Sequence, residues 1–292
     1  MRVEVISGRD IDSGLASIWR DLAAANPDLG SPYFCPQYTQ LTAQVRDDVY
    51  VSVVEDGGRV VGLLPFQKSF GRVGRPVSGP MSDYQGYICA PGTPQDAKRL
   101  VKASGLDMWE FDHLLASQDG FRPHHRVAET SPIIDVSRGF DAYVAERKAA
   151  GSKNIKKIRR MARVLERDVG KVRYEVHSLD RAVFDQLVAW KRQQCQTTGS
   201  EDLFGHDWAH ELLERIYATQ DEDFQGTLTA VWAGDTLAAA HMGMRRAARL
   251  GGRHSGRIRS RFTSAERTQQ YKRKQLPNVH ENHCSGRSEF PP

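Results

Sequence analysis

The chain of 292 residues carries 41 Lys and Arg against 36 Asp and Glu, a formal net charge of +5. Its hydrophobic fraction of 39% indicates a packed core rather than global disorder. No apolar run approaches the roughly 20 residues that span a bilayer, and the first residues lack the apolar region of a secretory signal. Four scattered cysteines predict reduced thiols. We therefore expect a cytoplasmic protein without a transmembrane segment, whose mild positive charge suits acidic small molecules.

The first half of the chain is predicted to contain strands, helices and one hairpin. A strand at residues 3–5 precedes a helix whose apolar residues recur over 11–22, and Pro36 can occupy the first position of a second helix. Residues 49–68 hold two β-rich runs around Asp56-Gly57-Gly58, which is a strong hairpin signal. Beyond it we expect an aromatic loop at 79–92, a helix at 95–103 and strands at 108–112 and 133–136.

The second half repeats this order of elements. Ser137 is predicted to cap a short helix, and Asp180 to cap a longer one after a strand at residues 172–176. Another helix follows over residues 208–216, and residues 226–245 form a second predicted hairpin. Because a hairpin follows a pair of helices in both halves, the sequence predicts two lobes built on one plan.

The two predicted lobes comprise residues 1–136 and residues 137–245. Residues 246–292 are rich in Arg, Ser and Gly and show almost no apolar periodicity. We expect this last segment to be irregular and disordered, so that the second lobe is incomplete.

The sharpest local feature is a basic helix predicted from residue 151 to residue 168. Its apolar residues recur at helical spacing and form a stripe that we expect to pack. Its basic residues recur beside the stripe and could bind the phosphates of a cofactor, a tRNA or an anionic glycan, or form a solvated face. Nucleic acid is the less favoured ligand, because interleaved aromatic residues are missing. The candidate binding residues are Lys153, Lys156, Lys157, Arg160 and Arg163.

Four stretches of sequence carry a resemblance to a known family. They are Val60-Val61-Gly62-Leu63-Leu64-Pro65, Ser82-Asp83-Tyr84-Gln85-Gly86, the basic helix beginning Ser152-Lys153, and a run from Trp190-Lys191-Arg192 to His241-Met242-Gly243-Met244-Arg245. In this order they resemble the CelD/BcsL-type acyltransferases of the GNAT superfamily, which are associated with cellulose and exopolysaccharide biosynthesis. The resemblance covers most of residues 30–245.

The resemblance implies an α/β fold of tandem GNAT-like lobes, with mixed, mostly antiparallel sheets flanked by helices. It also implies transfer of an acyl group, such as acetyl, from acyl-CoA to an amine or hydroxyl on a small molecule or glycan. A polysaccharide-synthesis complex would be a partner. Two alternatives stay open: a FemAB-like transferase that uses aminoacyl-tRNA, and a non-catalytic scaffold subunit of polysaccharide synthesis.

Three residues are candidates for the chemistry. Asp83 and Tyr84 could orient and deprotonate an acceptor, or form an Asx turn beside a packed ring. His241 could act as a base or proton relay, or be a core histidine. Lys191 is a substrate-binding candidate through the resemblance. Direct attack of the acceptor on the thioester needs no covalent nucleophile, which agrees with the absence of a Cys/His or Ser/His signature.

Other polar patterns are weaker. Glu110 and Asp112 lie one strand repeat apart and could pair as acid and base, or face solvent. His206 and His210 have metal-compatible spacing but no HExxH motif, so we expect no metal. Beyond Arg245 the family continues with a strand, a turn and a helix that this sequence lacks. That departure predicts weak cofactor binding and weak or absent activity.

Overall fold

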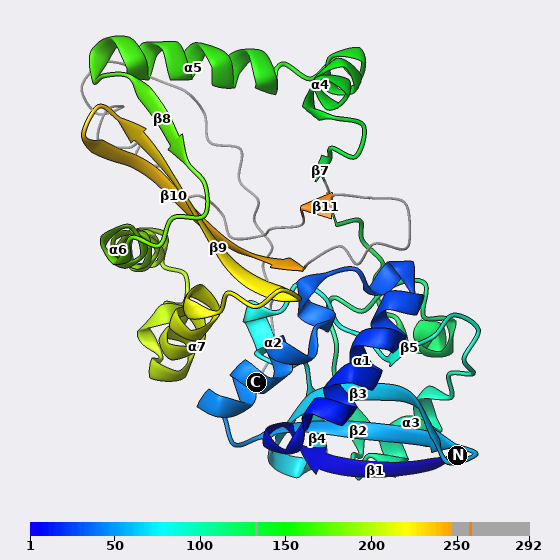
Figure 1. The fold of residues 1–292 in the computed structure, drawn as a ribbon. Coiled ribbons are helices and arrows are strands. Elements are labelled where there is room, and N and C mark those ends of the chain that lie inside the picture. The colour runs from blue at the N-terminus through cyan, green and yellow to red at the C-terminus, as the bar shows by residue number, and fades with distance from the viewer. Residues whose placement is uncertain (132–133, 247–256, 259–292) are drawn as a thin grey trace.

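The structure of the chain is a computed structural model that describes residues 1–131, 134–246 and 257–258 (Figure 1). It is a mixed α/β fold whose sheets are flanked by helices, as predicted. In Figure 1 the blue and cyan N-terminal elements gather at one end, and α5 lies beyond the β8–β10 sheet at the other. The helices are α1 (Ser13–Ala25), α2 (Pro36–Val45), α3 (Ala97–Ala103), α4 (Phe140–Ala149), α5 (Asn154–Asp168), α6 (Arg181–Thr198) and α7 (Asp207–Ala218).

The N-terminal sheet has the order β1-β2-β3-β4-β6, with β5 also pairing with β3. The predicted hairpin is confirmed as β2 and β3, joined by Gly57 and Gly58. Both glycines have positive φ angles of 56° and 76°, which side chains other than glycine rarely tolerate in a tight turn. The strands are β1 (Arg2–Ser7), β2 (Val49–Asp56), β3 (Arg59–Ser69), β4 (Val73–Arg75), β5 (Ile88–Cys89) and β6 (Met108–Trp109).

Helices α1 and α2 begin where local chemistry favours a helix start. The Asp12 side chain accepts a hydrogen bond from the Leu15 amide at 2.7 Å and caps α1. Pro36 occupies the first turn of α2, as predicted. The fully buried Trp19 of α1 packs with Leu63 and Ile88 of the sheet, and this cluster forms one of the cores of the molecule.

The C-terminal sheet has the order β10-β9-β8. Its predicted hairpin is confirmed, with β9 and β10 antiparallel around a turn at Gly234. Asp180 caps α6 as predicted, because its side chain accepts a hydrogen bond from the Ala182 amide at 2.8 Å. The strands are β8 (Val172–Glu175), β9 (Phe224–Ala233) and β10 (Thr236–Arg246), and a small sheet pairs β7 (Ile134–Asp135) with β11 (Arg257–Ile258).

Gly226 lets β9 approach α7 closely. A Cβ atom at this position would lie 2.0 Å from the backbone oxygen of Ile216, so the strand would have to move away from the helix. We expect Gly226→Ala to lower the free energy of unfolding by about 1–3 kcal/mol in urea denaturation. Gly14→Ala is the matched control, since the nearest atom to its Cβ is 3.4 Å away. Equal stability of both variants would contradict this packing.

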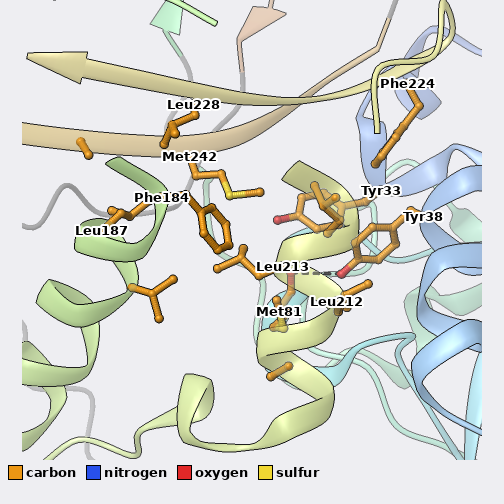
Figure 2. Packing of buried hydrophobic residues seen from close by; sticks show 14 of the residues in the cluster. Tyr33, Tyr38, Met81, Phe184, Leu187, Leu212, Leu213, Phe224, Leu228 and Met242 are labelled. Carbon is orange, nitrogen blue, oxygen red and sulfur yellow. Dashed lines mark hydrogen bonds between the residues drawn. The ribbon is translucent and has the colours of Figure 1, made fainter. Parts of the chain in front are cut away.

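One hydrophobic cluster joins elements from the two predicted lobes (Figure 2). Tyr33, Tyr38 and Met81 come from the N-terminal part of the chain, and they pack with residues of α6, α7, β9 and β10. Polar contacts reinforce the junction, because Arg215 donates to the Gln44 side chain at 2.8 Å and the Arg46 guanidinium lies 5.1 Å from the centre of the Trp208 ring. The C-terminal members of the cluster include Phe184, Leu187, Leu212, Leu213, Phe224, Leu228 and Met242.

Three expectations about local structure are wrong. Ser137 does not cap α4, because the N-cap residue is Gly139 with a φ angle of 88° and no side-chain hydrogen bond. The strand predicted at 108–112 covers only Met108–Trp109, although the Glu110 amide still donates to the Gly74 carbonyl oxygen of β4 at 2.8 Å. The apolar stripe of the basic helix packs only in part: Ile155, Ala162 and Leu165 are half-buried, Ile158 is exposed, and no residue of α5 is fully buried in the described part of the chain.

Most of the predicted tail, residues 246–292, lies outside the described residues. Arg246 ends β10, and its guanidinium donates to the Leu29 carbonyl oxygen at 2.7 Å. Among the helices that the structure describes, none has the length and apolar character needed to cross a bilayer.

Candidate functional site

Asp83 lies at the junction between the two parts of the chain. The Tyr33 hydroxyl donates a long hydrogen bond of 3.5 Å to Oδ2 of this half-buried carboxylate. The Tyr33 ring belongs to the cluster shared with α6 and α7, so Asp83 is placed beside that cluster. The Tyr84 ring lies 6.3 Å from the Tyr33 ring, centre to centre, and an equal distance from the Phe34 ring. The Asp83 carboxylate therefore lies against the Tyr33 hydroxyl, in a loop whose next residue, Tyr84, packs near the Tyr33 and Phe34 rings.

Two hydrogen bonds fix the loop that carries Asp83. The buried Tyr38 hydroxyl donates to the Met81 carbonyl oxygen at 3.2 Å, and the Ser82 hydroxyl donates to the Tyr84 carbonyl oxygen at 3.0 Å. Tyr38 itself lies on α2, whose first residue is Pro36. The loop is therefore held by a helix whose start is set by local sequence.

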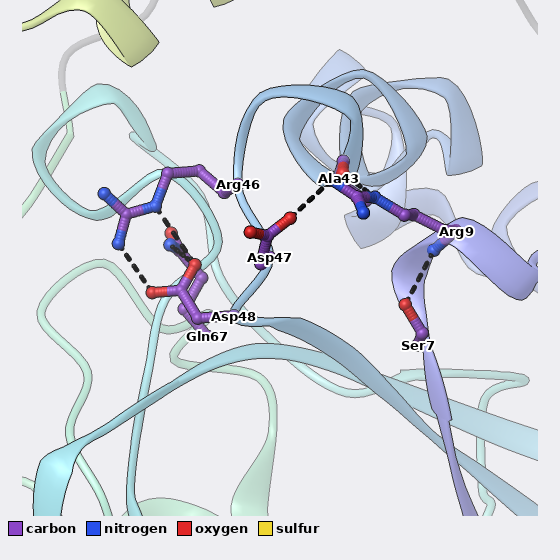
Figure 3. Close-up of polar contacts among 7 residues, drawn as sticks. All are labelled: Ser7, Arg9, Ala43, Arg46, Asp47, Asp48 and Gln67. Atoms are coloured by element: carbon purple, nitrogen blue, oxygen red, sulfur yellow. Dashed lines mark hydrogen bonds and ion pairs between the residues drawn. The ribbon is translucent and has the colours of Figure 1, made fainter.

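A second set of hydrogen bonds holds the preceding turn, at Ser78. Figure 3 draws three of its members, Arg46, Asp48 and Gln67. Arg46 donates to Asp48, and Gln67 donates to the same carboxylate at 2.9 Å while its oxygen accepts from the Ser78 amide at 2.6 Å. Burial by itself would raise the pKa of Asp48, but the hydrogen bonds from Arg46 and Gln67 outweigh it and lower that pKa. Asp48 thus stays ionised and serves as an anchor rather than a base.

Tyr33 and Asp83 differ in what they can do chemically. Burial raises the pKa of the Tyr33 hydroxyl far above its ordinary value, and the charges of Tyr38 and Asp83 act in the same direction. Tyr33 therefore remains a neutral phenol that donates a hydrogen bond at any physiological pH. Asp83 is the group of the pair that can accept a proton.

His241 lies on β10, paired with Thr229 of β9. Its neighbours Ala240 and Met242 are buried in the shared cluster, so strand alternation turns the imidazole to the other face of the sheet. Burial lowers the pKa of His241, and the positive charge of Lys191 lowers it further. Burial also lowers the pKa of Lys191, whose ammonium donates to the Gln194 side chain at 3.3 Å.

The lowered pKa of His241 gives a testable pH dependence. We expect His241 to titrate below its ordinary value of 6.5 in the folded protein, as followed by NMR of the imidazole protons. The unfolded chain then binds more protons than the folded chain as pH falls through 6.5. Stability contributed by the neutral imidazole is therefore present above this pH and lost below it. His241→Gln should weaken that acid dependence, and a titration at or above 6.5 would contradict the burial.

The structure brings some of the predicted site residues together and separates others. Asp83 and Tyr84 share the junction with Tyr33, and His241 lies within electrostatic reach of Lys191. In Figure 1, α5 lies beyond the β8–β10 sheet, at the end away from the N-terminal elements. The predicted binding residues on that helix are Lys153, Lys156, Lys157, Arg160 and Arg163, and they are exposed.

The acid and base pair suggested by Glu110 and Asp112 does not form. Glu110 pairs with Arg75 at 3.0 Å, whereas Asp112 accepts from the Gln85 side chain. Among the described residues, no group of three His, Cys, Asp or Glu side chains could hold a metal ion. His210 lies 3.6 Å from the Glu214 carboxylate.

Two features were missed in the sequence. Tyr33 is the partner of Asp83, and the only signal for it is the aromatic stretch before Pro36. A groove of about 670 Å³ opens where α2 meets the end of α7. From α2 it is lined by Gln37, Gln40 and Gln44, which share one side of the helix. The other polar residues that line it include Arg9, Arg215 and Gln220.

Comparison with known proteins identifies the C-terminal part of the chain. Residues 152–264 match the family model of the acetyltransferase (GNAT) domain. The matched range contains α5, α6, α7 and the β8–β10 sheet, and therefore Lys191 and His241. No curated protein matches the chain. Residues 152–264 are thus similar to a GNAT-type acetyltransferase domain, which suggests acyl transfer in general terms.

Proposed function

We propose, from the GNAT-type acetyltransferase domain at residues 152–264, that this chain transfers an acyl group from acyl-CoA to an amine or hydroxyl acceptor at the junction of its two parts. The observation that carries the proposal is Asp83, a half-buried carboxylate held against Tyr33 and beside the core of the GNAT domain. A carboxylate so placed can remove a proton from a bound acceptor.

The proposed reaction is a direct attack. The acceptor nitrogen or oxygen attacks the thioester carbonyl carbon, the carbon–sulfur bond breaks, and CoA leaves as its thiolate, which takes a proton from water. Asp83 takes the proton from the acceptor, and Tyr84 positions the acceptor against Asp83. His241, neutral near pH 7 because burial lowers its pKa, faces away from the shared cluster, so it exchanges no proton with Asp83 and remains a separate candidate base beside Lys191.

The backbone N–H groups at the edge of β10 are suited to polarise the thioester carbonyl. This strand pairs with β9 on one side, and no strand of the described part pairs with its other side. A β-bulge interrupts its register between Leu237 and Ala239. Outward backbone N–H groups on such an edge can donate to a developing oxyanion. We assign the thioester carbonyl to this edge, and we assign Lys191 to substrate binding.

The resemblance to the CelD/BcsL-type acyltransferases is the sole basis for two narrower proposals. The acceptor would be a glycan or a small molecule, and the chain would work with a polysaccharide-synthesis complex in the cytoplasm. The basic side chains of α5 would bind an anionic ligand, and they take no step in the acyl transfer proposed above.

Binding of the co-substrate tests the proposal first. The melting temperature of the full chain should rise with the logarithm of acetyl-CoA concentration, because ligand binds the folded state. Aminoacyl-tRNA, free tRNA and an uncharged pantetheine thioester are the comparison ligands. A shift with aminoacyl-tRNA alone would point to the FemAB-like alternative, and no shift with any of them would point to the scaffold alternative. Either result would overturn acyl-CoA dependence.

A further inference from the structure

Helix α5 has two faces of opposite character. Ile158, Met161 and Leu165 follow one another at spacings of three and four residues and so share one face. Lys156, Arg160, Arg163 and Arg167 share the other in the same way.

The apolar face is accessible in the described part of the chain. Ile158 is 60% exposed and Met161 is 37% exposed, while Leu165 is half-buried. On the preceding helix, α4, Phe140 is also exposed, at 57%. Large apolar side chains that are exposed next to one another mark an interaction surface more often than a solvated one.

The charge of α5 sets it apart from the rest of the molecule. Residues 153–168 contain seven basic and two acidic residues, whereas the remainder of residues 1–245 contains 23 basic and 31 acidic residues. Arg167 pairs with Asp168, but the other six basic side chains form no ion pair with any described residue. Elsewhere arginines are commonly paired, for example Arg181 with Asp185 at 2.7 Å. Six of the seven basic side chains of residues 153–168 thus present a concentrated positive charge that no described residue neutralises in an ion pair.

We propose that α5, together with Phe140 of α4, docks on the surface of an anionic lipid bilayer. A helix with a strongly basic face, an opposite apolar face and low overall hydrophobicity lies in the plane of the bilayer interface. Ile158, Met161 and Leu165 would enter the region between headgroups and acyl chains. Lys157 and Arg159 stand at the two borders between the faces, where long side chains reach the lipid phosphates.

The charge and the exposed apolar side chains of α5 together favour an anionic bilayer over a nucleic acid or a second copy of the chain. A nucleic acid would satisfy the basic residues but gives the exposed Ile158 and Met161 nothing to bury against. A second copy of the chain would cover the apolar face but would bring two positively charged helices together. An anionic bilayer satisfies both faces at once, because its phosphates attract the cations and its acyl chains receive the apolar side chains.

The test is co-sedimentation of the full chain with phosphatidylcholine vesicles, with and without phosphatidylglycerol, at low and high salt. We expect binding to the anionic vesicles only, and loss of binding at high salt. The triple variant Lys156→Gln, Arg160→Gln, Arg163→Gln should bind roughly a hundredfold more weakly, since each basic residue near the surface contributes a factor of about five. Removing Lys98, Arg99 and Lys102 of α3 in the same way is the matched control and should change little.

A second pair of variants tests the apolar face. Ile158→Ser with Met161→Ser should weaken vesicle binding about tenfold or more, whereas Phe70→Ser, at a fully exposed apolar residue on another surface, should not. Circular dichroism checks that each variant is folded. Binding that survives the α5 variants would overturn the proposal. So would binding of RNA in place of vesicles, or a concentration-dependent dimer that Ile158→Ser abolishes.

Discussion

Asp83→Asn reduces acyl-CoA-dependent turnover roughly a hundredfold or more, because the amide cannot accept the proton of the acceptor. The amide has nearly the size of the carboxylate and still accepts the hydrogen bond from Tyr33, so the fold and the affinity for acyl-CoA change little. Turnover is measured as release of the CoA thiol at saturating acyl-CoA.

Two further variants separate chemistry from position. Tyr33→Phe keeps the ring in the shared cluster and removes only the hydroxyl that donates to Asp83, so turnover should fall by a smaller factor than in Asp83→Asn. Asp119→Asn removes an exposed carboxylate that pairs with Arg122 and should leave turnover unchanged. Normal turnover in Asp83→Asn would show that Asp83 is a structural residue of the loop and takes no proton in the reaction.

Phe184→Ala lowers the free energy of unfolding by about 3–5 kcal/mol, since it removes a large ring from a packed core. Phe184 is fully buried, and its ring stacks on the Tyr217 ring with 4.7 Å between centres. Its cluster includes Tyr33, Tyr38 and Met81 from the N-terminal part, so the substitution should destabilise both parts of the chain.

The measurement is urea denaturation followed by tryptophan fluorescence and by circular dichroism. Leu179→Ala is the control, because Leu179 is 70% exposed and its truncation should change stability by less than about 0.5 kcal/mol. The two probes should give one coincident transition that shifts in Phe184→Ala. Two separate transitions, only one of which shifts, would show that the shared cluster does not couple the two parts.

The elements that sequence predicted well are those set by local chemistry. The turn at Gly57 and Gly58, the cap at Asp180 and the helix start at Pro36 each depend on a few neighbouring residues. A few consecutive residues of the sequence are therefore enough to predict each of them. The cap predicted at Ser137 was wrong because the short sequence window offers more than one possible start for α4. The helix starts after Gly139, whose φ angle is positive.

The candidate site was predictable only in part, because its contacts join distant residues. Tyr33 and Asp83 are 50 positions apart in the chain, and no periodicity relates them. The cluster that contains Tyr38 and Leu212 likewise depends on how the helices pack against one another. The order of strands and helices along the sequence does not specify that packing. For α5, the spacing correctly identified two faces but could not show that the apolar one stays exposed in the described part of the chain.

Acyl transfer is tested most directly by mass spectrometry of the products. The full chain is incubated with acetyl-CoA and a panel of amine and hydroxyl acceptors, beside Asp83→Asn. The account predicts one acceptor class that gains the mass of the acyl group while free CoA appears in equal amount, with little of either in the variant. Binding of acetyl-CoA without any acylated acceptor, or equal product from both proteins, would contradict it.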